Sequence, residues 1–285
     1  MTELQFADIQ GVRIAYEQKG RGKLPLLALH GFPRTHRTWL LLEPFLADYF
    51  HLIMPDRRGY GDSERVMDSS SYSLENMTSD AIGLMDYLGI DNFVVIGHDK
   101  GSPTARKIAF DYPDRVLAMV QIDSTPQELN DGSRDPSGRQ WYFDFFRQRN
   151  VAEKITTAIP ELFFGLFIDR NPHLPDSERQ FYVDQFSKPG TPEAVVWDYR
   201  LMLEKDPEYW RELTESGRKI IAPTLVLWGN IGPSANAPVL EQWRQVADNV
   251  TGMPVEMAAH YVHEQQPEIT AKHILNFMRD INLLK

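Results

Sequence analysis

The 285-residue chain carries a formal net charge of -10 and contains no cysteine. The acidic charge argues against nucleic acid as a partner, because no surplus of basic residues is available to neutralise phosphates. The absence of cysteine excludes disulfides, thiolate metal sites and cysteine nucleophiles. A hydrophobic fraction of 42% is enough for the core of one large α/β domain that carries an insertion.

Neither a membrane span nor a leader peptide is predicted. No stretch approaches the roughly 18 uninterrupted apolar residues that a spanning helix needs. The first residues, Met1 to Phe6, lack a basic and then apolar leader. We therefore expect a cytoplasmic protein without a membrane partner.

The chain opens with a predicted β-hairpin. Within residues 4–17, Val12, Ile14 and Tyr16 alternate with polar or small residues, and Gln10-Gly11 is a typical turn sequence. This pattern indicates two short strands joined at that turn.

Buried strands are expected at the next two apolar runs. Residues 26–29 form the first, which ends in His30-Gly31-Phe32-Pro33, and residues 51–54 form the second. By itself the sequence His30-Gly31 indicates only a turn.

A charged loop and a helix come next. Residues 56–63 are rich in glycine and charge, so we interpret them as a structural loop. A helix should begin after Ser73, a suitable N-cap, and end at Gly89. Apolar residues between these two positions recur every three or four residues, so they lie on one face of the helix.

The sequence around Asp99 predicts a nucleophile elbow. Residues 93–96 form a continuous apolar run, typical of a strand buried on both faces of a parallel sheet. Gly97 and Gly101 flank Asp99, so the chain can turn sharply into a helix and expose Asp99 at the amino end of that helix. The N–H groups and the dipole there favour a charged, nucleophilic carboxylate. The alternative is that the glycines only mark a turn and Asp99 is an N-cap.

A long insertion follows the next strand. The helix after the elbow should end near Tyr112-Pro113, and a strand over 116–122 leads to Asp123. Regular alternation of strands and helices then stops until about Glu215, a span too long for an ordinary connecting loop.

We interpret this insertion as a helical cap. It is rich in aromatic residues and is broken by prolines into short segments. Its rings either line a pocket over the elbow or hold the insertion on the core. We place the core domain at residues 1–125 and 216–285 and the cap domain at residues 126–215.

The strand pattern resumes after the insertion. We expect a strand at 223–229, a helix at 239–246 and a strand near Val255 to Met257. His260 lies in the loop beyond this last strand, and an amphipathic helix begins at about Ile269.

Asp123 is the carboxylate that we expect to orient His260. No carboxylate occurs over 230–235, directly after the strand that ends in Trp228-Gly229. Asp123 follows the strand beside the elbow strand, and the carboxyl ends of parallel strands share one edge of a sheet. The alternative for a lone aspartate is a helix cap or a solvated loop residue.

Two other histidines compete with His260. His263 is three residues further on, and His98 precedes Asp99, where strand alternation turns it away from Asp99 into the core. A zinc site made of His260 and His263 is not expected, because the further ligands of a closed site are missing. No metal or organic cofactor is implied.

Several motifs together resemble one family. They are His30-Gly31-Phe32-Pro33-Arg34-Thr35, Gly97-His98-Asp99-Lys100-Gly101, Asp123, Asp198-Tyr199-Arg200, and Ala259-His260-Tyr261 with Glu264 and Pro267. Over nearly its whole length the chain is similar to the α/β-hydrolase superfamily. Within it, the chain resembles the branch with aspartate nucleophiles, the epoxide hydrolases and the haloalkane or haloacetate dehalogenases. The resemblance implies an α/β fold with a mostly parallel sheet flanked by helices and an inserted helical cap.

The resemblance also implies a two-step reaction. Asp99 displaces a halide or opens an epoxide to form an alkyl ester, and water activated by His260 then hydrolyses that ester. Asp123 orients the imidazole, and the backbone N–H groups of Phe32 and Lys100 form the oxyanion hole.

Among members of this branch, the chain is most similar to haloacetate dehalogenases, which cleave the carbon–halogen bond of a small 2-haloacid. Lys100 would then pair with the substrate carboxylate. Residues expected to contact the substrate or its leaving group are His30, Lys100, Tyr142, Phe143 and Tyr199. The chain departs from these relatives where Pro103 replaces a second arginine and Phe143-Asp144 replaces a halide-binding His-Trp pair. These departures disfavour defluorination.

An epoxide hydrolase is the alternative. Tyr199 and a second cap phenol, Tyr142 or Tyr182, would protonate the opening oxygen. The missing halide ligands favour this alternative, whereas overall similarity favours the dehalogenase. A third hypothesis, a non-catalytic ligand receptor on the same scaffold, is disfavoured by the complete catalytic set. We expect a small-molecule substrate and leave a homodimer open.

Overall fold

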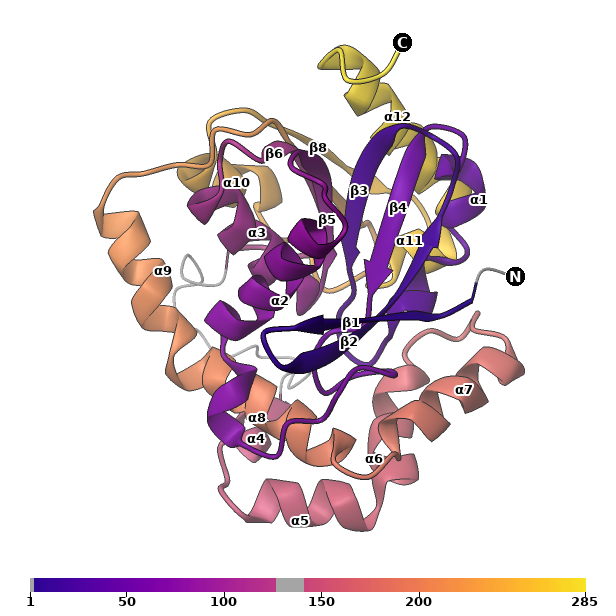
Figure 1. Cartoon of the computed structure of the whole chain (residues 1–285), viewed down its shortest axis with the longest axis vertical. Coiled ribbons are helices and arrows are strands. Elements are labelled where there is room, and N and C mark those ends of the chain that lie inside the picture. The colour runs from indigo at the N-terminus through magenta and orange to yellow at the C-terminus, as the bar shows by residue number, and fades with distance from the viewer. Residues whose placement is uncertain (1–2, 127–140) are drawn as a thin grey trace.

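The computed structural model describes residues 3–126 and 141–285, and one eight-stranded sheet lies at its centre (Figure 1). The strand order across the sheet is β1-β2-β4-β3-β5-β6-β7-β8. β2 pairs antiparallel with β1 and β4, and all other neighbours are parallel. The strands are β1 (Gln5–Ile9), β2 (Val12–Lys19), β3 (Leu24–Leu29), β4 (Phe50–Pro55), β5 (Phe93–His98), β6 (Val116–Ile122), β7 (Thr224–Gly229) and β8 (Val250–Val255).

The first two strands form the predicted hairpin. Gln10 and Gly11 connect them with φ angles of 53° and 82°, and Ile9 pairs with Val12 across the turn. Positive φ at both central residues gives the turn a twist that matches the flanking strands.

Helices cover both faces of the sheet (Figure 1). One face carries α2 (Leu74–Tyr87), α3 (Gly101–Asp111) and α10 (Val239–Val246), and the other carries α1 (Glu43–Leu46), α11 (Val262–Gln265) and α12 (Pro267–Asp280). Along β5, Val95 faces the first group, whereas Val94 and Ile96 face the second. Because helices cover both faces of the sheet, side chains on both sides of β5 are buried. This is why the strand is a continuous apolar run and does not alternate with polar residues.

The helix predicted after Ser73 is confirmed as α2. The Ser73 hydroxyl accepts a hydrogen bond from the backbone N–H of Asn76, which caps the first turn. Gly89 follows the end of the helix with a φ of 68°, a left-handed conformation that glycine adopts without steric cost.

The strand expected near Val255 to Met257 lies earlier in the chain. β8 spans Val250–Val255 and ends where it pairs with Gly229, the last residue of β7. Met257 has a φ of 56°, which a strand does not accommodate. Pro254 obscured the strand in the sequence, but β8 is an edge strand of the sheet, where proline is tolerated.

Helices α4 to α9 are inserted between β6 and β7 and form the cap; in Figure 1, α4 to α8 lie below the sheet and α9 lies at its left side. They are α4 (Trp141–Phe146), α5 (Val151–Ala158), α6 (Pro160–Ile168), α7 (Asp176–Phe186), α8 (Thr191–Glu204) and α9 (Asp206–Glu215). In the parts of the chain that the structure describes, no helix is both long and apolar enough to cross a membrane.

An aromatic cluster joins the cap to the loops of the sheet. Phe32, directly beyond β3, packs against Phe167, Phe186 and Tyr199, with ring centroids 5.0, 5.7 and 5.3 Å away. Tyr60, beyond β4, belongs to the same cluster. Since cap and sheet share this core, the division into domains at residues 126 and 215 stays a prediction.

We predict that Phe164→Ala lowers the free energy of unfolding by about 3–5 kcal/mol, because it opens a cavity in this aromatic cluster. Phe164 is fully buried on α6 and contacts Phe32, Phe163 and Phe186. The measurement is a urea unfolding curve. Leu162→Ala on the same helix is the control, and its 65% exposed side chain should cost within about 0.5 kcal/mol. Equal losses for the two variants would contradict the prediction.

Candidate active site

Asp99 lies in a tight turn between β5 and α3. Its φ of 49° is uncommon for a residue with a side chain. A Cβ on Gly97 would lie 2.8 Å from the carbonyl oxygen of Gly101, and a Cβ on Gly101 would lie 2.1 Å from that of Leu29. The turn therefore closes only because both flanking residues are glycine.

The loop after β3 holds one oxygen of this carboxylate. The backbone N–H of Phe32 donates to Asp99 Oδ1 at 2.7 Å. Gly31 makes this approach possible, because a Cβ there would lie 2.3 Å from that of Asp99. Lys100 is the N-cap of α3, and its role as the second backbone donor stays a prediction.

His260 bridges two carboxylates. Its Nδ1 lies 2.6 Å from Asp123 Oδ2, and its Nε2 lies 3.4 Å from Asp99 Oδ2. Asp123 directly follows β6, and its Oδ1 accepts a hydrogen bond of 3.3 Å from the backbone N–H of Gly229. Three residues far apart in the sequence thus meet at the carboxyl edge of the sheet.

The pKa values of this group indicate a charged resting state. Burial alone would raise the pKa of Asp99, but the hydrogen bond and charge of His260 hold it well below its usual value. Burial alone would lower the pKa of His260, but its hydrogen bonds to Asp123 and Asp99 raise it to about 10. Near neutral pH the site therefore holds a carboxylate at Asp99 beside a protonated imidazole.

The two competing histidines point elsewhere. His98 Nε2 donates to the backbone oxygen of His260 at 3.0 Å, while its Nδ1 has no hydrogen-bond partner among the described residues. His263 Nε2 contacts the Thr38 hydroxyl at 2.7 Å. Burial lowers the pKa of both imidazoles. Within residues 3–126 and 141–285, no cluster of three or more histidine, aspartate or glutamate side chains is arranged to hold a metal ion.

His30, which was expected to contact the substrate or its leaving group, uses both ring nitrogens within the protein, and its contact with a substrate stays a prediction. Its Nδ1 donates to the backbone oxygen of Gly31 at 2.9 Å, and its Nε2 accepts from the backbone N–H of Arg57 at 3.1 Å. The ring is fully buried, and burial lowers its pKa to about 4. Both nitrogens are thus used inside the protein, and the neutral ring orders the loop.

Lys100 also differs from expectation, because its ammonium group is paired within the protein. Its Nζ lies 2.9 Å from Asp198 Oδ1, on α8 of the cap. Arg57 Nη2 lies 3.3 Å from Asp198 Oδ2, and the Tyr60 hydroxyl donates to that oxygen at 2.6 Å. All four side chains are buried.

Arg57 and Tyr60 were missed because the loop over 56–63 was interpreted as only structural. The available signal was position. The loop directly follows β4, and the carboxyl ends of neighbouring parallel strands are where ligand sites form.

Two cap phenols lie within the electrostatic reach of Asp99. Burial raises the pKa of Tyr199 and of Tyr142, and the charge of Asp99 raises both further. The two rings meet edge to face with centroids 5.6 Å apart, and the Phe143 ring lies 5.9 Å from that of Tyr199. Of the two alternatives for a second phenol, this geometry favours Tyr142.

Two other cap candidates lie away from Asp99. The Tyr182 ring lies under the guanidinium of Arg34, whose Cζ is 4.7 Å from the centroid of the ring. The Asp144 carboxylate is 62% exposed and pairs with Arg147 at 3.0 Å. The charge of Asp144 is therefore paired with Arg147 and largely exposed to solvent.

Comparison with known proteins identifies the fold family of this chain. A family model described as the alpha/beta hydrolase fold matches residues 25–267. The soluble epoxide hydrolase of Corynebacterium sp. (strain C12) is 30% identical over 95% of each chain. The fluoroacetate dehalogenase of Burkholderia sp is 28% identical over 98% of this chain and 94% of its own. The solved epoxide hydrolase CorEH without ligand has a TM-score of 0.88 at 28% identity, over 99% of this chain and 100% of its own.

We predict that the stabilising effect of His260 is lost at high pH. Its pKa rises from 6.5 to about 10 on folding, so its contribution is fully present below pH 6.5 and is lost as the pH rises through 10. Relative to His260→Gln, the wild-type free energy of unfolding should fall between about pH 7 and 10. Urea unfolding across this range measures it.

His273→Gln is the control for this pH dependence. Burial lowers the pKa of His273, so removing its imidazole should not abolish the fall in stability. The prediction fails if wild type and His260→Gln show the same pH dependence.

Proposed function

This chain belongs to the α/β-hydrolase fold family and is a hydrolase of that family, and we propose that it works through a covalent ester on Asp99. The observation that carries the proposal is the bridge from Asp99 through His260 to Asp123, at 3.4 and 2.6 Å. A nucleophilic carboxylate, a base and an orienting acid are then in reach of one another.

The first step forms the ester. Asp99 Oδ2 attacks a saturated carbon of the substrate, and the bond from that carbon to the leaving atom breaks. Asp99 Oδ1 keeps its hydrogen bond from Phe32 and becomes the carbonyl oxygen of the ester. This displacement needs no base, which suits a site whose imidazole is protonated at rest.

Ester formation then turns His260 into a base. The charge of Asp99 is one of the contacts that raise the pKa of His260. The neutral ester removes that charge, so the pKa falls and the proton passes to the leaving group or to solvent. The neutral imidazole, still oriented by Asp123, can now activate water.

Hydrolysis restores the enzyme. Water attacks the ester carbonyl carbon while His260 takes its proton, and the negative charge moves to Asp99 Oδ1. The Phe32 N–H group is already 2.7 Å from this oxygen and stabilises the charge. Collapse of the intermediate releases the alcohol and returns Asp99 as a carboxylate.

We place the opening of an epoxide to a diol first among substrates, which reverses the order expected from the resemblance of the sequence motifs to haloacetate dehalogenases. Tyr199 packs against Phe32, the residue whose N–H holds Asp99 Oδ1, and Tyr142 packs against Tyr199. We therefore assign the protonation of an opening oxygen to one of these two phenols. Lys100, the expected partner of a substrate carboxylate, is bound to Asp198. A neutral substrate therefore fits this site better than a haloacid.

Hydrolysis of a carbon–halogen bond is the second candidate. Two buried cations, Lys100 and Arg57, share the one carboxylate of Asp198, which leaves a net positive charge near the leaving group. Similarity to the fluoroacetate dehalogenase also favours it. A non-catalytic receptor has least support, because such a protein would not need the bridge at His260.

We predict that His260→Gln stalls as a covalent adduct on Asp99. The displacement needs no base, whereas hydrolysis of the ester does. Intact-protein mass spectrometry after incubation with small epoxides and 2-haloacids measures the gain in mass. An opened epoxide keeps its oxygen and a displaced halide departs, so the mass also identifies the leaving chemistry.

Asp99→Ala is the control for the adduct and should gain no mass and lose turnover. If wild type turns over a substrate while His260→Gln accumulates no adduct from it, the covalent mechanism is wrong. Wild-type turnover of haloacids but not epoxides would restore the dehalogenase to first place.

We also predict that replacing both phenols, Tyr142→Phe with Tyr199→Phe, slows adduct formation from an epoxide by about 100-fold or more, because the alkoxide loses its proton donors. The rate of adduct formation in the His260→Gln background measures this step. Tyr182→Phe is the control, since that phenol ring lies over Arg34 instead. Equal slowing by the control would contradict the assignment.

A further inference from the structure

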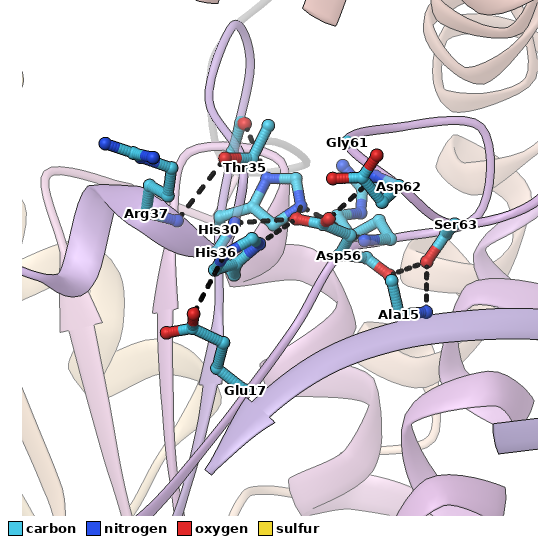
Figure 2. Close-up of polar contacts among 12 residues, drawn as sticks. Ala15, Glu17, His30, Thr35, His36, Arg37, Asp56, Gly61, Asp62 and Ser63 are labelled. Atoms are coloured by element: carbon cyan, nitrogen blue, oxygen red, sulfur yellow. Dashed lines mark hydrogen bonds and ion pairs between the residues drawn. The ribbon is translucent and has the colours of Figure 1, made fainter. Parts of the chain in front are cut away.

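The loop that carries Phe32 is flanked by two histidines that approach the same buried carboxylate. Figure 2 shows His30 and His36 on one side of Asp56, which directly follows β4. Asp56 Oδ1 accepts from the backbone N–H of His36 at 2.8 Å and lies 2.8 Å from its Nδ1. His30 Nε2 lies 4.0 Å from the same oxygen.

Asp56 is itself held by its own loop. Its Oδ2 accepts from the backbone N–H of Asp62 at 2.8 Å. Its backbone oxygen accepts from the Ser63 hydroxyl at 2.7 Å, and its backbone N–H donates to Ala15 in β2 at 2.8 Å. A Cβ on Gly61 would lie 2.1 Å from Oδ2. The enclosed carboxylate is thus fixed to the sheet, and water has no access to replace it.

Charge strengthens the contact with His36. Burial alone would lower the pKa of His36, but the charge and hydrogen bond of Asp56 raise it. Burial alone would raise the pKa of Asp56, but His36 lowers it to about 2. Glu17 adds a second carboxylate 4.0 Å from His36 Nε2 (Figure 2). Both pKa shifts favour the charged form of each partner, in which the hydrogen bond is stronger than one between neutral groups.

Both ends of the loop over 30–36 are tied to the start of the loop over 56–63. His36 is bound to Asp56, and His30 accepts from the backbone N–H of Arg57. Phe32 lies between these two anchors, and its N–H reaches Asp99 Oδ1 at 2.7 Å.

We propose that Asp56 is a positioning residue that holds the Phe32 N–H group on Asp99 through His36, and that it acts mainly on hydrolysis of the ester. The second part rests on the function proposed above. In the resting carboxylate the charge is shared by two oxygens and balanced by His260. In the tetrahedral intermediate the charge gathers on Oδ1, so a displaced donor slows hydrolysis more than ester formation.

Asp56→Asn tests the proposal, because it keeps the side-chain shape and removes the charge. Rapid mixing with a substrate that turns over, followed by mass spectrometry, separates the rates of the two steps. Hydrolysis should slow by about 10-fold or more and ester formation by less than about threefold, so that adduct accumulates. The proposal is overturned if the two steps slow equally or if no adduct accumulates.

Asp80→Asn is the matched control. Asp80 is also buried and forms a two-point ion pair with Arg58 of the same loop, at 2.5 and 2.6 Å. None of its described contacts reaches the loop over 30–36. A general loss of stability should affect both variants, whereas a change in the ratio of the two steps should appear only in Asp56→Asn.

A second measurement needs no substrate. Amide hydrogen exchange over 30–36 should quicken in Asp56→Asn and stay unchanged in Asp80→Asn. If Asp56→Asn does not fold, His36→Gln should give the same changes, since it removes the imidazole that contacts Asp56. Unchanged exchange in a folded variant overturns the proposal. Failure of the covalent chemistry itself appears separately, as the absence of an adduct in His260→Gln.

Discussion

The negative charge of Asp99 is held in a turn that leaves almost no room around it. Glycines at 31, 97 and 101 stand where any Cβ would press on neighbouring atoms. The same crowding brings a backbone N–H within 2.7 Å of the carboxylate and an imidazole within 3.4 Å. The tight packing of the turn and the low pKa of Asp99 are therefore linked. A buried carboxylate keeps its charge only if hydrogen-bond donors lie at contact distance, and the tight turn places them there.

A second buried carboxylate couples the cap to the elbow. Asp198 on α8 binds Lys100, the residue after Asp99, and also Arg57 beyond β4. The neighbouring Tyr199 packs against Phe32, whose N–H holds Asp99. This arrangement fastens the cap and at the same time withdraws the Lys100 charge from a substrate carboxylate. The contacts of Asp198 with Lys100 and Arg57 therefore also hold the cap on the loops of the sheet.

The loop over 30–36 is restrained from several sides by buried charges. Asp56 binds its end through His36. Arg34, in the middle of the loop, donates two hydrogen bonds to the Glu264 carboxylate, one from Nε and one from Nη2. Glu264 also accepts a hydrogen bond from the side chain of Asn171, between α6 and α7. Removing one partner of such a pair leaves a buried charge without compensation, which destabilises a protein strongly. The position of the Phe32 N–H group thus depends on buried charged residues outside the group of Asp99, Asp123 and His260.

The sequence by itself determined the elements whose signals are local. The apolar run before Asp99, its flanking glycines, the hairpin turn and the cap at Ser73 are each written within a few residues, and the structure has all of them. Among the strands, β8 was misplaced. Its Gly252 and Pro254 are unusual in a strand, and its position is set by pairing with β7.

Tertiary structure alone decided which side chains meet. Lys100 and Asp198 are far apart in the chain, as are Asp99 and the two phenols of α4 and α8. Whether a lysine faces a substrate or a carboxylate depends on how the cap helices pack over the sheet. That packing rests on aromatic rings, which carry no directional signal in the sequence. The sequence therefore predicted the order of the candidate residues along the chain. It did not predict which charged side chains, such as Lys100, are paired within the protein.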